Sequence, residues 1–262
     1  QGDLKGLAER VRPWPGLGIT ALVSLPWYLL AALVEGKPFV ESFFGYHNLQ
    51  RFTGVVNNHL QPWWFFLPVL VVASLPFTPL LFAGLVGGFA GRGESLPPEQ
   101  SLQRYATCWV LAVLLFFTLA ATKLPSYWLP ATPAAGLLVA LAAQRCRRWA
   151  WGLSLLLTAV LAGGFAAGPL WLPLIEAPEM PSLVAELLAA PWVPLAAAFW
   201  ALALLLGAWA GWRKDALSGL LALQLPLAAF VPAVLLPLVE LGDRLRAAPV
   251  RELAAEARSA RR

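Results

Sequence analysis

Seven long apolar runs constrain the fold of this chain more than any other feature. They cover residues 17–34, 63–90, 105–122, 131–143, 149–171, 191–211 and 216–239. A helix of about 20 apolar residues crosses the hydrocarbon core of a bilayer, where each backbone polar group must be hydrogen-bonded internally. Charged residues make up 13% of the chain, against about 25% in soluble domains. The sequence therefore predicts an all-α, polytopic membrane bundle of about seven transmembrane helices, spanning residues 17–239.

The distribution of lysine and arginine predicts the orientation of this bundle. Ten of these residues lie in 1–16, 91–104, 144–148 and 212–215, whereas the alternate connectors carry only Lys37, Arg51 and Lys123. Cytoplasmic loops are enriched in Lys and Arg. Residues 1–16 are therefore predicted to be a cytoplasmic flank, and the loop 35–62 is predicted to lie at the outer interface.

Three polar segments lie outside the apolar runs. A surface helix is expected after Pro98, before the third span, and residues 172–190 read as an acidic loop. Residues 240–262 contain six arginines and read as an alanine-rich helix on the outer side. Long translocated segments do not follow the charge rule, so we expect this stretch to begin an exported carboxyl-terminal domain that is cut short here. An eighth span with a cytoplasmic tail is the alternative.

The distribution of polar residues argues against two classes of function. No basic stripe interleaves with aromatic residues in a soluble segment, as a nucleic-acid groove requires, so nucleic acid is not an expected partner. Ionisable residues are nearly absent from the spans, whereas proton- and ion-coupled transporters place them there. The functional site is therefore expected at a membrane surface.

The outer loop PFVESFFGYHNLQRFTGVVNNHLQPWWFF presents the first candidate site residues. Phe43, His47 and Arg51 recur every four residues, so they share one stripe of a helix lying in the interface. The guanidinium group of Arg51 offers a planar fork of donors that matches phosphate oxygens. The alternative is that Arg51 extends to lipid headgroups and His47 is a surface imidazole.

The connector KLPSYWLP presents the second group of candidates. Its two prolines fix the backbone around Tyr127 and Trp128, and Lys123 lies at the end of a span. An ammonium and a phenol held in this way could bind a phosphate or a sugar hydroxyl. The alternative is that Lys123 extends to the interface and Trp128 anchors the helix.

These motifs together resemble one family. FFGYHNLQRF, HLQPWWFFLPVL and KLPSYWLPATPA are similar to the carboxyl-terminal half of bacterial aminoarabinose-transferase-like and protein-mannosyltransferase-like enzymes, over roughly residues 10–250. The resemblance implies a GT-C fold in the bacterial inner membrane. It also implies transfer of a sugar from a polyprenyl-phosphate-linked donor to a lipid, glycan or protein acceptor at the outer, periplasmic face.

The same resemblance implies roles for individual residues. Arg51 and Lys123 would line the site of the lipid-linked phosphate, and Tyr127 would lie beside the same cavity. His47 corresponds to a position near which members of the family bind a divalent metal. An exported carboxyl-terminal domain would follow the last span.

The chain departs from the family in the position of its carboxylates. The family's catalytic acidic residue lies in an amino-terminal half that this chain does not contain. Nothing marks Glu35 or Glu41 as a general base in its place. The piece alone is therefore expected to be inactive. Two further hypotheses stay open: a transporter or flippase of lipid-linked sugars, and an assembly subunit without a site of its own.

Overall fold

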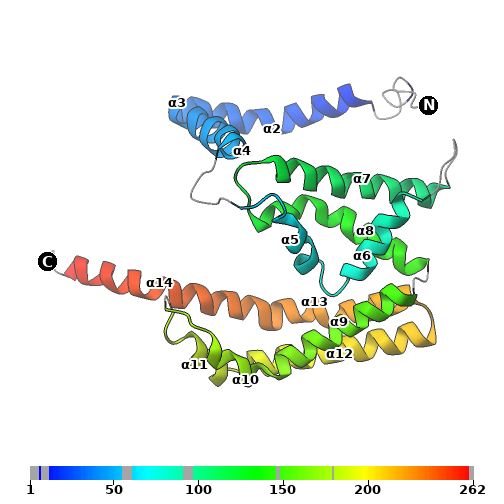
Figure 1. Cartoon of the computed structure of the whole chain (residues 1–262). Coiled ribbons are helices and arrows are strands. Elements are labelled where there is room, and N and C mark those ends of the chain that lie inside the picture. The colour runs from blue at the N-terminus through cyan, green and yellow to red at the C-terminus, as the bar shows by residue number, and fades with distance from the viewer. Residues whose placement is uncertain are drawn as a thin grey trace. The chain divides into compact units, whose positions relative to one another are not determined.

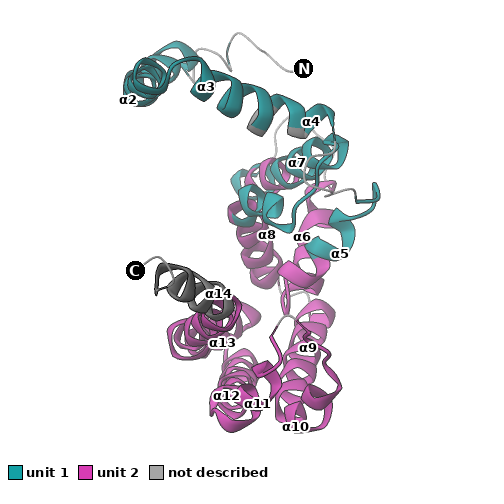
Figure 2. Ribbon diagram, turned by 90° about the vertical axis from the view of Figure 1, so that its left-hand side faces the viewer, with its two compact units in different colours: residues 1–70, 91–101, 108–132 teal, residues 71–90, 102–107, 133–262 magenta. Residues whose placement is uncertain are grey.

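The computed structural model describes residues 6, 12–54, 61–90, 97–145, 148–178 and 180–259. The side chains of residues 47, 48, 51 and 248–259 lie outside that description. The described part is helical, without strands, and divides into two units (Figures 1 and 2). The first unit is residues 1–70, 91–101 and 108–132, and the second is residues 71–90, 102–107 and 133–262.

The predicted number of spans is confirmed within the described residues. Six helical stretches are long and apolar enough to cross a membrane: Pro13–Glu35, Pro98–Leu119, Pro125–Gln144, Arg148–Ala166, Trp192–Arg213 and Ala216–Ala247. Two further apolar helices, Phe66–Ala73 and Thr78–Phe89, meet at 116° and bring the number to seven if the pair counts as one span. This bend falls in the second apolar run, which contains Pro68, Pro76 and Pro79. Membrane helices tolerate such prolines. The chain is an integral, multi-pass membrane protein.

The first unit begins with a helix whose apolar residues face outward. Helix α2 (Pro13–Glu35) leaves Leu22 76% and Leu33 81% exposed, as expected of a helix surrounded by lipid. It ends at Gly36, whose φ of 66° is readily reached only without a side chain. Helices α3 (Lys37–Val40), η1 (Glu41–Gln50) and α4 (Arg51–Thr53) follow as one continuous segment (Figure 1). The predicted interfacial segment is therefore helical, with π-helical geometry over η1.

Aromatic side chains fix the segment α3–η1 against α2. The ring of Trp27 contacts that of Phe39 at a centroid distance of 5.9 Å, and the ring of Tyr28 contacts that of Phe43 at 5.4 Å. Edge-to-face and tilted ring pairs of this kind add roughly 0.5–1.5 kcal/mol to the burial of their area. They hold the amino-terminal half of the loop 35–62 in place, directly before Arg51.

The rest of the first unit comes from two helices that both units share and from the connector between spans. Helix α5 (Phe66–Ala73) contributes its first residues. Helix α7 (Pro98–Leu119) contributes both its start and its carboxyl-terminal part. The prediction of a separate surface helix after Pro98 is wrong, because α7 is uninterrupted. Its polar start is compatible with a span because Gln103 is buried and donates through Nε2 to the Gly84 carbonyl, at 2.7 Å.

The second unit is a helical bundle with a small helical segment between two of its spans. Its elements are α6 (Thr78–Gly88), α8 (Thr132–Gln144), α9 (Arg148–Ala166), α10 (Gly168–Trp171), η3 (Leu172–Leu174), α11 (Leu183–Ala189), α12 (Trp192–Arg213), α13 (Ala216–Phe230), η4 (Val231–Leu235) and α14 (Leu236–Ser259). Helix α12 packs on both α9 and α13, and α6 packs on α9. The predicted acidic loop 172–190 is thus partly helical. Residues 216–259 form one unbroken helical stretch, and the exported domain stays a prediction.

Helix α13 begins at an aspartate that caps it. Asp215 has an extended backbone, and its carboxylate accepts a hydrogen bond from the Ser218 amide at 2.7 Å. This amide lowers the pKa of the Asp215 carboxyl most, and Lys214 lowers it further by its charge. The ionised form therefore stabilises the start of α13.

This cap predicts a dependence of stability on pH. Because the pKa of Asp215 is lower in the folded state, its contribution is present above the ordinary aspartate range and is lost as the pH falls below about 4. We expect the melting temperature to fall less over that range in the Asp215→Asn variant, which keeps an acceptor oxygen but cannot titrate. Thermal melts followed by tryptophan fluorescence at several pH values would show it. Parallel curves for the two proteins would contradict the assignment.

Candidate functional site

Two segments that are distant in the sequence are hydrogen-bonded to each other in the first unit. The amide of Ala121 donates to the carbonyl of Phe52 at 3.0 Å. The hydroxyl of Thr122 donates to the carbonyl of Gly54 at 3.1 Å. The end of α4 and the segment after α7 are therefore joined. Arg51 directly precedes the first of these bonded residues, and Lys123 directly follows the last.

The local sequence explains the geometry around Lys123. Helix α7 ends at Leu119, and the backbone is extended at Ala120 and at Leu124. A residue that precedes proline is disfavoured in the helical region, so Pro125 imposes the extended shape on Leu124. Pro125 then starts the 3₁₀-helix η2 (Pro125–Ala131), since a first-turn proline loses no hydrogen bond. Lys123 is thus held in a short extended segment between two helices.

Lys123 is a buried cation for which the described residues provide one hydrogen-bond acceptor. Its side chain is 8% exposed, and its ammonium donates to the carbonyl of Ala120 at 2.8 Å. An ammonium group carries three donors, and no carboxylate among the described residues forms a salt bridge with it. Burying an ammonium group without an opposite charge costs several kcal/mol. An anion bound beside Lys123 would offset that cost.

Tyr127 lies one turn further along, in η2. Its ring stacks on that of Phe117 at a centroid distance of 4.6 Å, with 27° between the planes. The ring of Phe117 in turn contacts that of Phe66 at 6.5 Å. Tyr127 is half-buried, and its neighbour Trp128 is buried. The phenol is thus held in a fixed position on the same connector as Lys123.

Arg51 and His47 are placed by their backbones alone. Arg51 begins α4, one residue before the carbonyl of Phe52 that bonds to Ala121, and His47 lies within η1. The side chains of both lie outside the described part. The whole of His59, the other histidine of the loop 35–62, lies outside it as well. That the guanidinium of Arg51 meets the ammonium of Lys123 therefore stays a prediction, as does the phosphate-binding role of both.

The described residues contain no metal-binding cluster and no carboxylate placed to act as a catalytic base. No group of three His, Cys, Asp or Glu side chains in the described ranges lies close enough together to hold an ion. The metal ion near His47 stays a prediction. Glu41 is exposed and forms a salt bridge with Lys37 at 3.4 Å. Glu35 is also exposed, so neither carboxylate has the surroundings of a catalytic base.

Thr122 is a site residue that the motifs did not indicate. It is 1% exposed and bonds across to Gly54, so it fixes the backbone beside Lys123. A threonine at the end of an apolar run reads as an ordinary membrane residue. Its role depends on a partner 68 positions away in the sequence, which no local pattern reveals.

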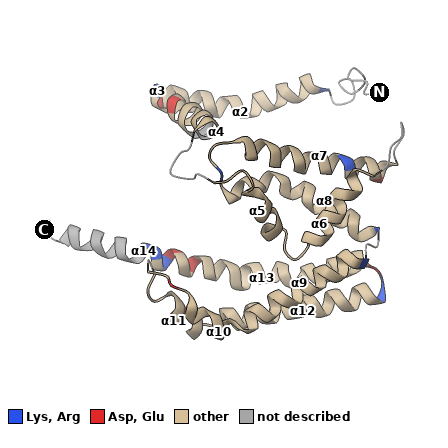
Figure 3. Cartoon of the chain, viewed as in Figure 1, with Lys and Arg blue, Asp and Glu red and all other residues tan. Residues whose placement is uncertain are grey.

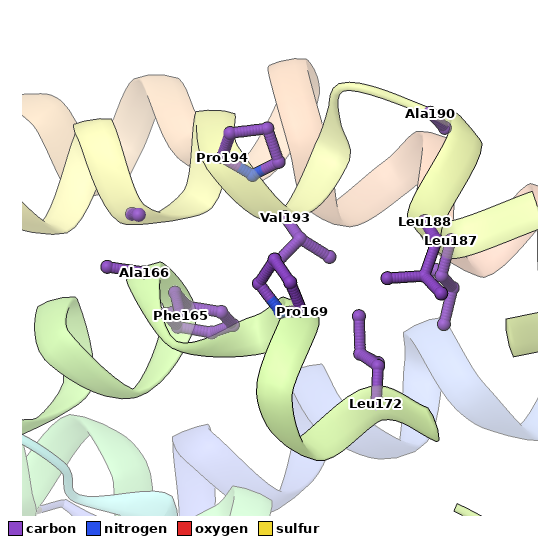
Figure 4. Close-up of a pocket in the computed structure, with 10 residues that line it drawn as sticks. Phe165, Ala166, Pro169, Leu172, Leu187, Leu188, Ala190, Val193 and Pro194 are labelled. Carbon is purple, nitrogen blue, oxygen red and sulfur yellow. The ribbon is translucent and has the colours of Figure 1, made fainter. Parts of the chain in front are cut away.

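A cavity in the second unit is too apolar to bind a phosphate. It has a volume of about 380 Å³ and lies beside α9, α10, α11 and α12 (Figure 4). Its walls include Phe165, Leu172 and Val193, and all of its lining side chains are apolar. Its side chains therefore offer no hydrogen bond and no opposite charge to a phosphate.

Comparison with known proteins agrees with the resemblance in sequence. No protein-family model matches the chain. An undecaprenyl phosphate-alpha-4-amino-4-deoxy-L-arabinose arabinosyl transferase of Sodalis glossinidius is 38% identical over 128 residues, which are 49% of this chain and 22% of that protein. A transferase of the same description from Serratia proteamaculans is 36% identical over 129 residues, which are again 49% of this chain and 22% of that protein.

A solved structure extends the match over most of the chain. The crystal structure of ArnT from Cupriavidus metallidurans bound to undecaprenyl phosphate covers 86% of this chain with a TM-score of 0.66 and 24% sequence identity. The chain resembles the aminoarabinose transferases. Its fold is that of a part of ArnT, so the predicted GT-C membrane fold is confirmed for that part. The chain spans 40% of the length of the crystallised ArnT and less of the two aminoarabinose transferases compared by sequence.

Proposed function

We propose that this chain is the part of a membrane glycosyltransferase that holds a polyprenyl-phosphate-linked sugar at the outer face of the bacterial inner membrane. The buried ammonium of Lys123, with one carbonyl as its described hydrogen-bond partner, is the observation that carries the proposal. The similar proteins are named for undecaprenyl-phosphate-linked 4-amino-4-deoxy-L-arabinose. Such a donor would place one phosphate between an apolar chain and a sugar.

Lys123, Arg51 and Tyr127 lie at or near the two hydrogen-bonded segments, the end of α4 and the stretch after α7, and each has its own role in this proposal. In the reaction, the bond between the anomeric carbon and the phosphate oxygen breaks, and the anomeric carbon forms a bond with an acceptor oxygen. Negative charge then grows on the departing polyprenyl phosphate. Lys123 and Arg51 would stabilise this charge, and they would do so most strongly in the transition state. Tyr127 would position the phosphate or the sugar by its hydroxyl.

The remaining chemistry needs a group besides Lys123, Arg51 and Tyr127. The acceptor hydroxyl must lose its proton, which calls for a carboxylate acting as general base. Glu35 and Glu41 do not fit that role, so we assign it to a part of the protein outside the matched segment. The distribution of Lys and Arg supports the outward orientation of the site.

The proposal is tested by separating sugar transfer from lipid movement. The full-length protein, purified in detergent, is incubated with a radiolabelled undecaprenyl-phosphate-linked aminopentose and a lipid acceptor carrying free hydroxyl or phosphate groups. We expect label to move to the acceptor, because transfer needs no intact bilayer. Movement of the donor across vesicles without transfer in detergent would favour a flippase instead. Absence of both activities, with tight donor binding, would favour an assembly subunit.

A further inference from the structure

A second cavity in the second unit combines cations, tryptophans and an apolar floor. It has a volume of about 480 Å³ and is lined at its rim by Arg148, Trp212, Lys214 and Asp215. Trp151, which is 8% exposed, forms part of its wall. The cavity lies where α9 begins and where the turn joins α12 to α13, and Figure 3 shows basic residues at this end of these helices.

The spacing of the lining residues makes the cavity a groove that runs along the helices. On α9 the lining positions are 148, 151, 152 and 155, and on α12 they are 208, 211 and 212. Residues three, four and seven apart share one helix face. Leu155 lies seven residues beyond Arg148, about 10 Å along the axis at 1.5 Å per residue. The groove thus passes from a charged rim at the end of three spans into their apolar interior.

The charges at the rim favour an anion. Asp215 is the acid on the wall, but its carboxylate is bonded to the Ser218 amide at the start of α13. Its influence on Lys214 is that of a neighbouring charge, and no salt bridge joins Arg148 or Lys214 to a carboxylate among the described residues. Two cations therefore face one carboxylate that helix amides already hold.

We propose that this cavity binds the phosphate headgroup of an anionic phospholipid, with an acyl chain lying along the groove. Arg148 and Lys214 bind the phosphate by charge-assisted hydrogen bonds, and Arg offers a planar fork that matches its oxygens. Trp212, which is 91% exposed, lies at headgroup depth beside it. Leu155 and Ala208 contact the chain. Basic pockets between transmembrane helices suit such headgroups, whereas a free phosphate would leave the apolar part of the groove unused.

The glycine at position 152 provides a way to close the groove without disturbing the helix. A side chain added at Gly152 would meet no atom within 4 Å, and the residue lines the cavity. Gly163 lies on the same helix with equally open surroundings, and it lines neither of the two cavities described above. The substitutions Gly152→Leu and Gly163→Leu are therefore a matched pair. By contrast, a side chain at Gly211 would lie 2.7 Å from Nε1 of Trp151 and would disturb the packing.

The test measures lipid binding to the full-length protein by native mass spectrometry. Phosphatidylglycerol and phosphatidylcholine are added separately, and inorganic phosphate is added as a competitor. We expect phosphatidylglycerol to be retained over phosphatidylcholine. Arg148→Gln should weaken its binding about tenfold, as expected for the loss of a hydrogen bond between charged groups. Gly152→Leu should weaken it similarly, whereas Gly163→Leu should not.

The control for charge is Arg145, which is exposed and lies in the same basic stretch but does not line the cavity. Arg145→Gln should leave phosphatidylglycerol binding within about twofold of the unmodified protein, because an exposed charge contributes little at this distance. An equal loss in Arg145→Gln would indicate attraction to the whole basic surface and would overturn the proposal. Competition by inorganic phosphate that is unaffected by Gly152→Leu would identify a site for free phosphate and would also overturn it.

Discussion

Replacing Lys123 with methionine is expected to abolish sugar transfer by the full-length protein without lowering its free energy of unfolding. Methionine has a similar length and fills the same buried volume. It removes the ammonium that lies with 8% exposure beside the carbonyl of Ala120. Burying an ammonium group without an opposite charge costs several kcal/mol. Removing that cost offsets the lost hydrogen bond to Ala120, so the protein should still reach the membrane and fold.

The loss of activity should be large because the charge acts where the reaction needs it. Removing one group that stabilises a developing anion lowers kcat by roughly 10²–10³. Steady-state transfer assays with the purified variant would measure this, and a thermal melt would verify the fold. The matched control is Lys37→Met, since Lys37 lies in the first unit too but is 83% exposed and bonded to Glu41. Turnover of Lys123→Met equal to that of the unmodified protein would remove Lys123 from the donor site.

A second large effect is expected at Gly84, where two helices of the second unit meet. A side-chain carbon at Gly84 would lie 2.6 Å from the carbonyl oxygen of Leu138 and 2.9 Å from its carbonyl carbon. Both atoms belong to the backbone of α8, so no side-chain rotation can relieve the clash. Gly84→Ala must therefore separate α6 from α8, and overpacking of this kind costs about 1–3 kcal/mol. It also disturbs the bond between Gln103 and the Gly84 carbonyl.

Replacing Gly136 with alanine should have the opposite effect on the free energy of unfolding. This residue lies on α8, and a side chain there would meet no atom within 4 Å. Alanine in a helix interior is roughly 0.5–1 kcal/mol more favourable than glycine, so Gly136→Ala should stabilise the protein slightly. Equilibrium unfolding in mixed micelles of increasing denaturing detergent would compare the two variants. A Gly84→Ala variant as stable as Gly136→Ala would contradict the close packing of α6 on α8.

The membrane fold was predictable because apolar run length is a local property. Each span needs about 20 apolar residues, and this requirement is visible in the sequence without knowledge of what the helix contacts. The bend after Ala73 lies beside Pro76 and Pro79, which limit the helical hydrogen bonds there. The uninterrupted α7 was not predictable, because Gln103 reads as a surface residue. Its amide is compatible with burial only through the carbonyl of Gly84, a contact between helices that no local pattern contains.

The residues of the candidate site stay a prediction, and the contacts that hold them in place were not visible in the sequence. Basic side chains in two outer connectors predicted a phosphate site, because guanidinium and ammonium groups donate hydrogen bonds to phosphate oxygens. The burial of Lys123 was not visible, because a lysine at the end of a span ordinarily extends to the interface. The bonds from Ala121 and Thr122 to the end of α4 join residues far apart in the sequence, and only the folded chain brings them together.

The bond between Ala121 and Phe52 has a consequence for how such sequences can diverge. Both of its partners are main-chain atoms, so it makes no demand on the identity of either side chain. Only proline at position 121 would remove the donor. This bond can therefore persist while the side chains at 52 and 121 change over evolutionary time. Proteins that share this geometry need not share a recognisable motif at either position.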